Sequence, residues 1–188
     1  QASQEIGDGQ HRDQFVVALQ SYDRTGPLLP FFFERGLRAL RIDHANVLIL
    51  GYHTRMPSRR VLDAADRLRQ RGLVRHLAIS GHRRPFFAEC SAMRDLPFDV
   101  FMMRYNAAHR GCETEVFPHL PASDRPGVIA YTATRWGDLL DARRMPPSER
   151  PLTAAECYRF TLTNPAVDLC LTGPANVQQM DEALTALE

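Results

Sequence analysis

The sequence predicts an α/β fold of the TIM type, a (β/α)8 barrel of which about six βα units are present in this chain. Short apolar runs alternate along the chain with helical segments, which favours right-handed βαβ units around a parallel sheet. The runs are continuously apolar, as is typical of strands buried on both faces. Most of them end at small, polar or imidazole residues, at the position where barrel enzymes hold their sites. These ends are Gly51-Tyr52-His53, Ser80-Gly81-His82, Tyr105-Asn106, Tyr131-Thr132 and Thr172-Gly173.

The length of the chain limits the number and the completeness of its domains. The 188 residues, 44% of them hydrophobic, suffice for one domain with a core, but a complete barrel needs roughly 250 residues. The chain begins with Gln1 in a polar stretch that lacks the apolar centre of a secretory signal. We therefore expect residues 1–188 to form a single barrel domain that is incomplete at its N-terminus, and the sequence to begin inside a larger protein.

The first half of the chain predicts three strands and two helices. Pro27 and Pro30 favour a helix start, and the apolar side chains at 32, 33, 37 and 40 give that helix one apolar side. Gly72 is a typical stop for the next helix. The predicted elements are a strand at 15–19, a helix at 28–41, a strand at 46–50, a helix at 57–71 and a strand at 76–80.

The second half continues the alternation around a polar, proline-rich insert at 138–151. Thr153 with Glu156 three residues later forms a capping-box pattern, which predicts the helix start. That helix is expected to end before Asn164-Pro165. The predicted elements are a helix at 85–93, a strand at 98–105, a helix at 113–120, a strand at 127–131, a helix at 153–163, a strand at 167–171 and a helix at 176–187.

Composition excludes several classes of function. The 23 basic and 22 acidic side chains are interspersed, so no basic patch predicts nucleic-acid binding. No apolar run approaches the ~18 residues of a membrane span. The four cysteines contain no CxxC pair, which favours reduced thiols and a cytoplasmic location. Every basic side chain besides histidine is arginine, so chemistry that requires a lysine amine is excluded within this chain.

Several segments occur in an order that is similar to the motifs of one family. The most specific is RGLVRHLAIS at 71–80, which resembles xGKIRxIGVS. The others are SQEIG at 3–7 (SEExLG), LRALRID at 37–43 (SLxRLxxD), YN at 105–106 (xYN), GVIAYT at 127–132 (GIxVIAYSP) and NPAV at 164–167 with Gly173 (NPxVxxxIPG). Nearly the whole chain thus resembles the aldo/keto reductase superfamily of NADP-dependent barrel enzymes.

The resemblance implies a catalytic tetrad of Asp, Tyr, Lys and His, in which a tyrosine phenol donates a proton while hydride arrives from nicotinamide. It places the Asp and the Tyr on two strands before this chain. The chain departs from the family at the other two positions, where Gln20 replaces the lysine and Gly51 the histidine. His53 is our candidate catalytic residue, because it faces the same side as Gly51 if the strand continues. The alternative is an exposed loop histidine.

The resemblance also implies positions that bind the dinucleotide. Ser80 would approach the nicotinamide carboxamide, and Tyr131 would stack on the ring unless it is a core or rim tyrosine. Thr132 and the backbone after it would pass the pyrophosphate, with Arg135 as its charge partner or as a surface residue. Trp136, the only tryptophan, lies in the same loop.

The last strand end and helix start extend this predicted cofactor site. Barrels often bind phosphate between such a loop and the helix N-terminus, which points to Gly173 and Asn176. Gln179 and Glu182 match family positions that reach the adenine. NADP(H) is favoured over NAD(H), although Ala175 and Asn176 replace family residues that hold the 2′-phosphate.

Strand-end position makes Tyr52, His82 and Tyr105 candidate substrate contacts. The leading hypothesis is an aldo/keto reductase-like oxidoreductase that moves hydride between NADP(H) and a small carbonyl or alcohol, with an atypical or degenerate site. The alternative is a non-catalytic nicotinamide-dinucleotide-binding or regulatory relative, since the lysine and the histidine are both replaced. A metal-dependent hydrolase using His53, His82 and His109 is a third hypothesis, but no His-x-His pair supports it, and we predict no metal site.

Overall fold

The computed structural model describes residues 12–188, so the SQEIG motif at 3–7 lies outside the described residues. The chain divides into two compact units. The first holds the described residues up to Phe86 together with Arg94–Val100, and the second holds Phe87–Met93 and Phe101–Glu188. The single domain that we expect over residues 1–188 stays a prediction.

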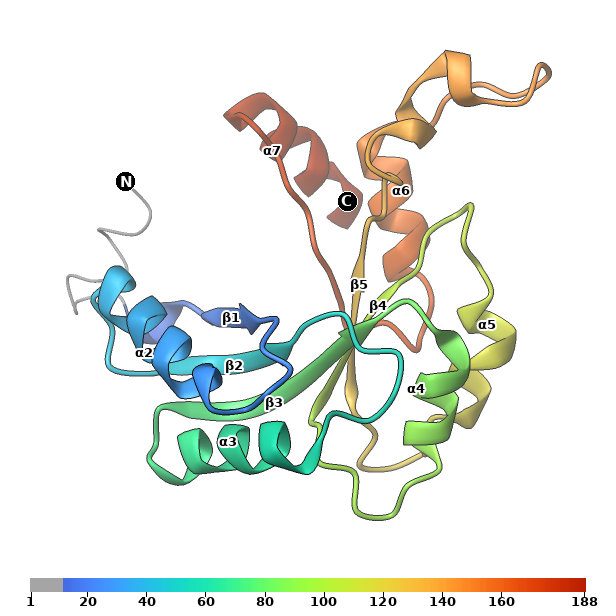
Figure 1. Ribbon diagram of the computed structural model, residues 1–188. Helices are drawn as coiled ribbons and strands as arrows, with labels where there is room; N and C mark the ends of the chain where they lie inside the picture. The colour runs from blue at the N-terminus through green and yellow to red at the C-terminus, as the bar shows by residue number, and fades with distance from the viewer. Residues whose placement is uncertain (1–11) are drawn as a thin grey trace. The chain divides into compact units, whose positions relative to one another are not determined.

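The first unit is built on three parallel strands, β1 (Ala18–Ser21), β2 (Ala45–Leu50) and β3 (Val74–Gly81) (Figure 1). In register, Gln20 pairs with Ile49 and Leu50 pairs with Ile79. All residues of β2 except Asn46 are buried, because this central strand is covered by a neighbour on each edge. The carboxyl ends of the three strands consequently lie side by side.

Two amphipathic helices cover this sheet. Helix α2 (Leu28–Leu40) packs on β1, and helix α3 (Arg59–Gln70) packs on β3 and on α2. Their buried residues recur every three or four positions, which is the spacing of one helix face. These residues are Leu29, Phe33 and Leu37 in α2 and Val61, Ala64, Ala65 and Leu68 in α3.

The turn before α2 requires glycine. Gly26 has a φ of +92°, which side chains rarely adopt, and a Cβ there would lie 2.6 Å from the carbonyl oxygen of Arg60. Gly72, after α3, has a φ of +73° but meets nothing within 4 Å. The first glycine therefore permits close contact with α3, whereas the second only permits the turn.

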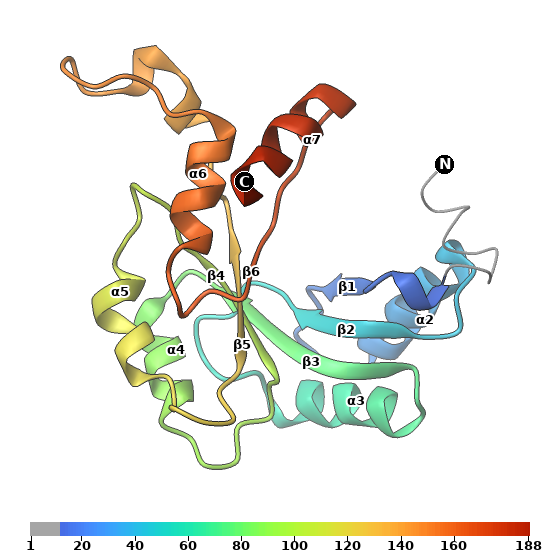
Figure 2. The ribbon, with the colours of Figure 1, turned by 180° about the vertical axis from the view of Figure 1, so that it is seen from behind.

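The second unit contains the remaining strands and helices (Figure 2). Helix α4 and strand β4 each begin in the first unit and continue into it. Strands β5 and β6 pair in parallel, and helices α6 and α7 lie against each other. The elements are α4 (Arg84–Ser91), β4 (Val100–Arg104), α5 (Cys112–Glu115), the 3-10 helix η2 (Phe117–His119), β5 (Gly127–Tyr131), the 3-10 helices η3 (Asp138–Leu140) and η4 (Ala142–Arg144), α6 (Ala154–Leu162), β6 (Leu169–Cys170), α7 (Val177–Leu184) and η5 (Thr185–Leu187).

An ion pair joins the starts of the last two strands. The Arg125 guanidinium donates to both carboxylate oxygens of Asp168, at 2.7 and 2.8 Å, and the backbone amide of Val128 donates to the same carboxylate at 2.7 Å. The Arg125 hydrogen bonds hold the pKa of Asp168 below its usual value. This contact fixes the register in which β6 meets β5.

Most of the predicted elements are confirmed, β5 with the predicted bounds and the others with shifted bounds. The capping box of α6 forms as expected, with Glu156 N donating to Thr153 Oγ1 at 3.1 Å and Thr153 N to Glu156 Oε2 at 2.8 Å. The helix expected at 113–120 is wrong as a single element, because Pro118 cannot continue an α-helix and the chain passes into η2. The first strand begins at Ala18, since Phe15 and Val16 are exposed.

None of the helices that the structure describes is long and apolar enough to span a membrane.

We predict that Gly26→Ala destabilises the protein far more than Gly72→Ala. Both substitutions place a side chain at a positive φ, which costs about 1 kcal/mol. Only Gly26→Ala also places a methyl group against the backbone of Arg60. The free energy of unfolding of this variant should therefore fall by about 3 kcal/mol. Urea unfolding followed by circular dichroism measures both, and equal losses would show that the close approach to α3 is not needed.

Candidate functional site

Ser80 joins the carboxyl ends of the three strands of the first unit. Its Oγ accepts a hydrogen bond from the Tyr52 amide at 3.0 Å and one from Gln20 Nε2 at 3.3 Å. Its carbonyl oxygen accepts from the His53 amide at 2.7 Å. Ser80 is buried, and these contacts leave the hydroxyl hydrogen as its one side-chain donor. Ser80, which is predicted to contact the nicotinamide carboxamide, is thus held in place by the loop after β2 and by β1.

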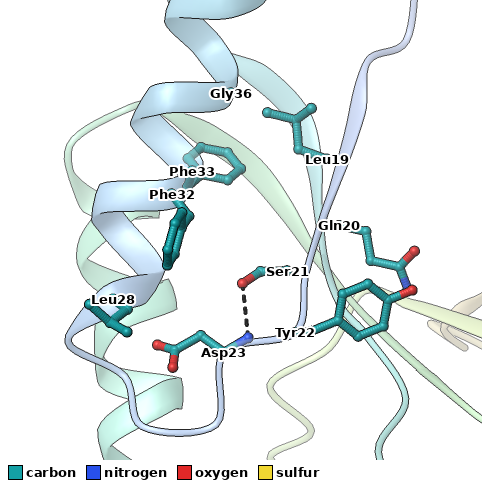
Figure 3. A pocket seen from close by; sticks show the side chains of 9 residues that line it. All are labelled: Leu19, Gln20, Ser21, Tyr22, Asp23, Leu28, Phe32, Phe33 and Gly36. Atoms are coloured by element: carbon teal, nitrogen blue, oxygen red, sulfur yellow. Dashed lines mark hydrogen bonds between the residues drawn. The ribbon is translucent and has the colours of Figure 1, made fainter.

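The two positions at which the sequence departs from the resembled family lie next to each other. A Cβ added to Gly51 would lie 2.7 Å from Gln20 Nε2 and 2.8 Å from the Tyr22 ring. Gln20 and Tyr22 project from the side of β1 opposite α2 (Figure 3). A histidine at position 51 therefore has room only if both side chains move and the contact between Gln20 and Ser80 is lost.

The pocket shown in Figure 3 lies at the end of β1. Its volume is about 430 Å³. Its walls are mostly apolar, and Phe33 is buried while Phe32 is half exposed. The carboxylate of Asp23 accepts from the amides of Thr25 and Gly26, each at 2.9 Å, so it serves the turn before α2. The lining residues are Leu19, Gln20, Ser21, Tyr22, Asp23, Leu28, Phe32, Phe33 and Gly36.

His53 is bound by an arginine from the loop after β1. Arg24 NH1 lies 2.8 Å from His53 Nε2, and Arg24 NH2 donates to the carbonyl oxygens of Gly51 at 2.6 Å and of Tyr52 at 2.8 Å. Because a guanidinium only donates, Nε2 of His53 is the acceptor and its proton is on Nδ1. His53 is 6% exposed, so the alternative of an exposed loop histidine is wrong.

The orientation of His53 has a different cause from the predicted one. The predicted orientation requires the strand to continue past Gly51, but β2 ends at Leu50 and Tyr52 has a φ of 56°. This left-handed residue breaks the alternation of faces that the prediction assumed. His53 is turned inward by its backbone bond to Ser80 and by Arg24 instead.

The surroundings of His53 favour its neutral form. Burial, and then the positive charge of Arg24, lower its pKa from 6.5 to about 4. At neutral pH the imidazole carries no charge, with Nε2 occupied by Arg24. Such a side chain offers Nδ1–H as a hydrogen-bond donor to an oxygen, but it is a poor proton donor.

Tyr52 and His82 lie together, as their shared strand-end positions predict. Their rings meet edge to face, with centroids 5.1 Å apart. Tyr52 is 58% exposed and His82 is partly buried. The structure therefore groups four predicted residues of the first unit, namely His53, Ser80, Tyr52 and His82.

Arg24 is the site residue that the sequence analysis missed. It lies in a turn, DRTG, where an arginine carries no motif. Its partners are 27 to 29 residues away in the sequence. A contact of this kind becomes visible only when β1 and β2 are paired.

In the second unit, predicted cofactor residues lie at the end of β5. Tyr131 and Thr132 are partly buried, and the Thr132 carbonyl oxygen accepts from Asn106 Nδ2 at 2.7 Å and from the Arg135 amide at 2.8 Å. Thr132, Arg135 and Trp136 all have a φ between 53° and 58°. The loop is thus a tight turn fixed by Asn106, and Arg135 forms an ion pair with Asp138 at 3.7 Å.

The predicted residues around α7 are bonded to the protein's own backbone. Asn176 Oδ1 accepts from the Gln179 amide at 2.9 Å, which caps the helix, and Gln179 Oε1 accepts from the Ala175 amide at 2.7 Å. Glu182 accepts from the Ala154 amide at 3.2 Å. Gly173 and these three side chains are exposed. The cap satisfies one of the four amides that a helix start leaves unpaired, so the others can bind an anion.

Tyr105 lies in the core of the second unit. It is 1% exposed and packs on the rings of Phe117 and Phe160. Its hydroxyl donates to Glu113 at 2.7 Å and accepts from Asn164 at 3.2 Å. Burial and the bond to Glu113 raise its pKa to about 12. This environment argues against the predicted contact with substrate, and we leave Tyr105 out of the proposal below.

The described residues offer no set of side chains that would support the metal hypothesis. Among residues 12–188, no three His, Cys, Asp or Glu side chains are placed to hold a metal ion. His109, one of the three histidines in that hypothesis, contacts Asn106 Oδ1 through its Nδ1 at 3.1 Å.

Comparison with known proteins identifies the fold. No family model and no curated protein sequence matches the chain. Among solved structures, the holo form of an aldo-keto reductase from Bacillus halodurans matches with a TM-score of 0.79 and 21% identity, covering 99% of this chain and 71% of that one. Its apo form gives a TM-score of 0.75. A provisionally named aldo-keto reductase from Pseudomonas aeruginosa gives 0.72, with 16% identity, covering 98% of this chain and 72% of that one.

The comparisons confirm the predicted fold class. Six strands alternate with helices within residues 12–188, and the chain has the fold of part of an aldo-keto reductase (β/α)8 barrel. The resemblance that the motifs indicated is therefore confirmed at the level of the fold.

We predict that His53 makes the protein less stable as the pH falls from about 6.5 to about 4. Because the pKa of His53 is lower in the folded than in the unfolded state, protons bind the unfolded state preferentially in this window. The stabilisation is complete above pH 6.5 and is lost as the pH falls towards 4. The His53→Gln variant should lose less stability across this window in urea unfolding.

His119→Gln is the control, because His119 is exposed. A further variant, Arg24→Gln, should raise the pKa of His53 measured by NMR but leave it below 6.5, since the backbone bond to Ser80 still holds His53 in its buried position. A His53 that titrates at 6.5 in the unaltered protein would contradict the assignment.

Proposed function

We propose that the protein is an oxidoreductase of the aldo-keto reductase type, which transfers hydride between NADP(H) and a small carbonyl or alcohol at an atypical site. The observation that carries this proposal is the fold likeness, which extends over 99% of the chain and includes a holo structure. The predicted site residues of the first unit support it, because they lie at or just after the carboxyl ends of β2 and β3, where barrel enzymes hold their chemistry.

In this proposal the first unit would position and polarise the carbonyl group of the substrate. A bound nicotinamide would supply or accept the hydride. Ser80 would donate its hydroxyl hydrogen to the carboxamide, since its oxygen already accepts from Tyr52 and Gln20. His53 would donate Nδ1–H to the carbonyl oxygen and so polarise the bond without giving up a proton. Tyr52 and His82 would border the substrate.

The second unit would hold the dinucleotide. Tyr131 would stack on the nicotinamide, and the turn from Thr132 to Arg135 would follow the pyrophosphate. The start of α7, with Gly173, Asn176, Gln179 and Glu182, would bind phosphate and adenine. The residues fit such a group, because most amides at this helix start remain available to an anion. We favour NADP(H) over NAD(H), as the family resemblance implies, and Arg135 would supply a cationic side chain within this turn.

A non-catalytic dinucleotide-binding protein is the second candidate. It is favoured by the contact of Gln20 with Ser80 and by the side chains that fill the space beside Gly51. A neutral amide cannot lower the pKa of a phenol as an ammonium does. Both candidates bind a small molecule and need no nucleic acid. The four free cysteines support a cytoplasmic setting for either.

We predict that NADPH quenches the emission of Trp136 saturably, and more tightly than NADH does. Trp136 is 69% exposed in the turn proposed to follow the pyrophosphate. The Tyr131→Ala variant should weaken NADPH binding about tenfold by removing the stacking surface. Met93→Ala, at an exposed position, is the control. Absence of binding to either nucleotide in the intact protein would overturn both candidates.

Turnover separates the two candidates. If the protein is a reductase, a panel of aldehydes should include compounds that it reduces with NADPH, measured by the loss of absorbance of the reduced cofactor. The His53→Gln variant should then lose about tenfold in kcat with little change in cofactor affinity, because a polarising donor acts on the transition state. Tight cofactor binding with no turnover across the panel would favour the non-catalytic candidate.

A further inference from the structure

A second pocket lies in the loop between β2 and α3, with a volume of about 290 Å³. Two arginines, Arg24 and Arg55, line it together with the buried His53. No acidic side chain is among its lining residues in the described chain. The others are Tyr52, Thr54, Met56, Pro57 and Ser58.

The charge of Arg24 is not neutralised by its partners. It donates three hydrogen bonds, to two backbone carbonyl oxygens and to the neutral His53 ring. A guanidinium has five N–H groups, so two remain to be satisfied. Within residues 12–188 no carboxylate lies at ion-pair distance from Arg24 or from Arg55.

The acidic residue next to Arg24 in the sequence has other hydrogen-bond partners. Asp23 precedes Arg24, but its carboxylate accepts from Thr25 and Gly26 and lines the separate pocket beside α2. Other arginines of this unit do have acidic partners, such as Arg59 with Asp63 and Arg71 with Glu34. The pocket in the loop after β2 therefore combines two guanidinium groups that no carboxylate of residues 12–188 neutralises.

The fixed position of Arg24 suits it to bind an anion. Its three hydrogen bonds restrain the guanidinium, so little side-chain entropy is lost when a ligand binds. Carboxylate and phosphate oxygens match the geometry of a guanidinium fork. Arg55 is exposed and can close on the same ligand.

We propose that this pocket binds the anionic group, carboxylate or phosphate, of the small molecule on which the protein acts. The inference rests on the proposed function for its statement about substrate, but the binding of the anion itself does not depend on it. It restricts the substrate class to carbonyl or alcohol compounds that carry a negative charge.

Direct binding tests the site without cofactor or turnover. Inorganic phosphate and, separately, acetate are titrated into the intact protein while NMR follows the amides of residues 52–58 and the His53 ring. We expect saturable shifts for at least one of these anions. Arg55→Gln should weaken binding about fivefold, and Arg55→Glu should abolish it, because the second substitution replaces attraction with repulsion.

Arg75→Gln is the matched control. Arg75 is an exposed arginine at the start of β3, opposite the strand end that carries Ser80. This variant should bind as the unaltered protein does. Equal weakening by Arg75→Gln and Arg55→Gln, or no saturable shift with either anion, would overturn the site. No ion pair within residues 12–188 includes Arg55, so its substitution leaves the hydrogen bonds of Arg24 in place.

Substrate choice is tested with matched pairs. Formylbenzoate is compared with its methyl ester, and glyceraldehyde phosphate with glyceraldehyde, by kcat/KM with NADPH. At least one charged member should be preferred by about tenfold, and Arg55→Gln should reduce that preference. Anion binding without turnover of any aldehyde would support the anion site and contradict the proposed reductase activity. Turnover without a preference for either charged member would reject the inference about substrate and retain the reductase.

Discussion

The hydrogen bonds of Arg24 are the constraint on which the candidate site of the first unit depends. A single guanidinium holds the carbonyl oxygens of Gly51 and Tyr52 and the ring of His53. These contacts offset the cost of the left-handed backbone conformation at Tyr52 and keep His53 buried. The low pKa of His53 follows from this burial and from the same positive charge. One residue thus sets the shape of the loop, the tautomer of the histidine and the potential of the pocket beside it.

The sequence could predict what depends on neighbouring residues. Strand β5 has the predicted bounds, and the capping box of α6 forms between Thr153 and Glu156, because strand burial and helix capping leave local patterns. The grouping of Ser80 with His53 could also be predicted, since one lies at the end of β3 and the other just after the end of β2. Arg24 was not, because its role arises from pairing between β1 and β2. The burial of Tyr105 was missed for a related reason, as its partners Glu113 and Asn164 come from other elements.

The second unit shows how one polar side chain can serve two roles. Asn176 and Gln179 were chosen as ligands of a dinucleotide, yet both cap the start of α7. The two roles are compatible in Asn176, because capping fixes the helix start and leaves its remaining amides to bind phosphate. They compete in Gln179, whose side-chain oxygen is already used by the Ala175 amide. Adenine could then meet only the amide nitrogen of Gln179.

Glutamine at position 20, where the resembled family has lysine, limits the chemistry that the first unit can support. An ammonium near a phenol stabilises the phenolate and makes the phenol a better acid, whereas the Gln20 amide only donates a hydrogen bond, here to Ser80. The positive charge in this part of the first unit lies on Arg24, which does not give up protons and contacts His53 Nε2. In the proposed reaction these residues would orient and polarise the carbonyl, and the proton would come from another group. A site of this kind gains most from a substrate whose own charge is held by arginine, since fixed orientation then compensates for weaker acid catalysis.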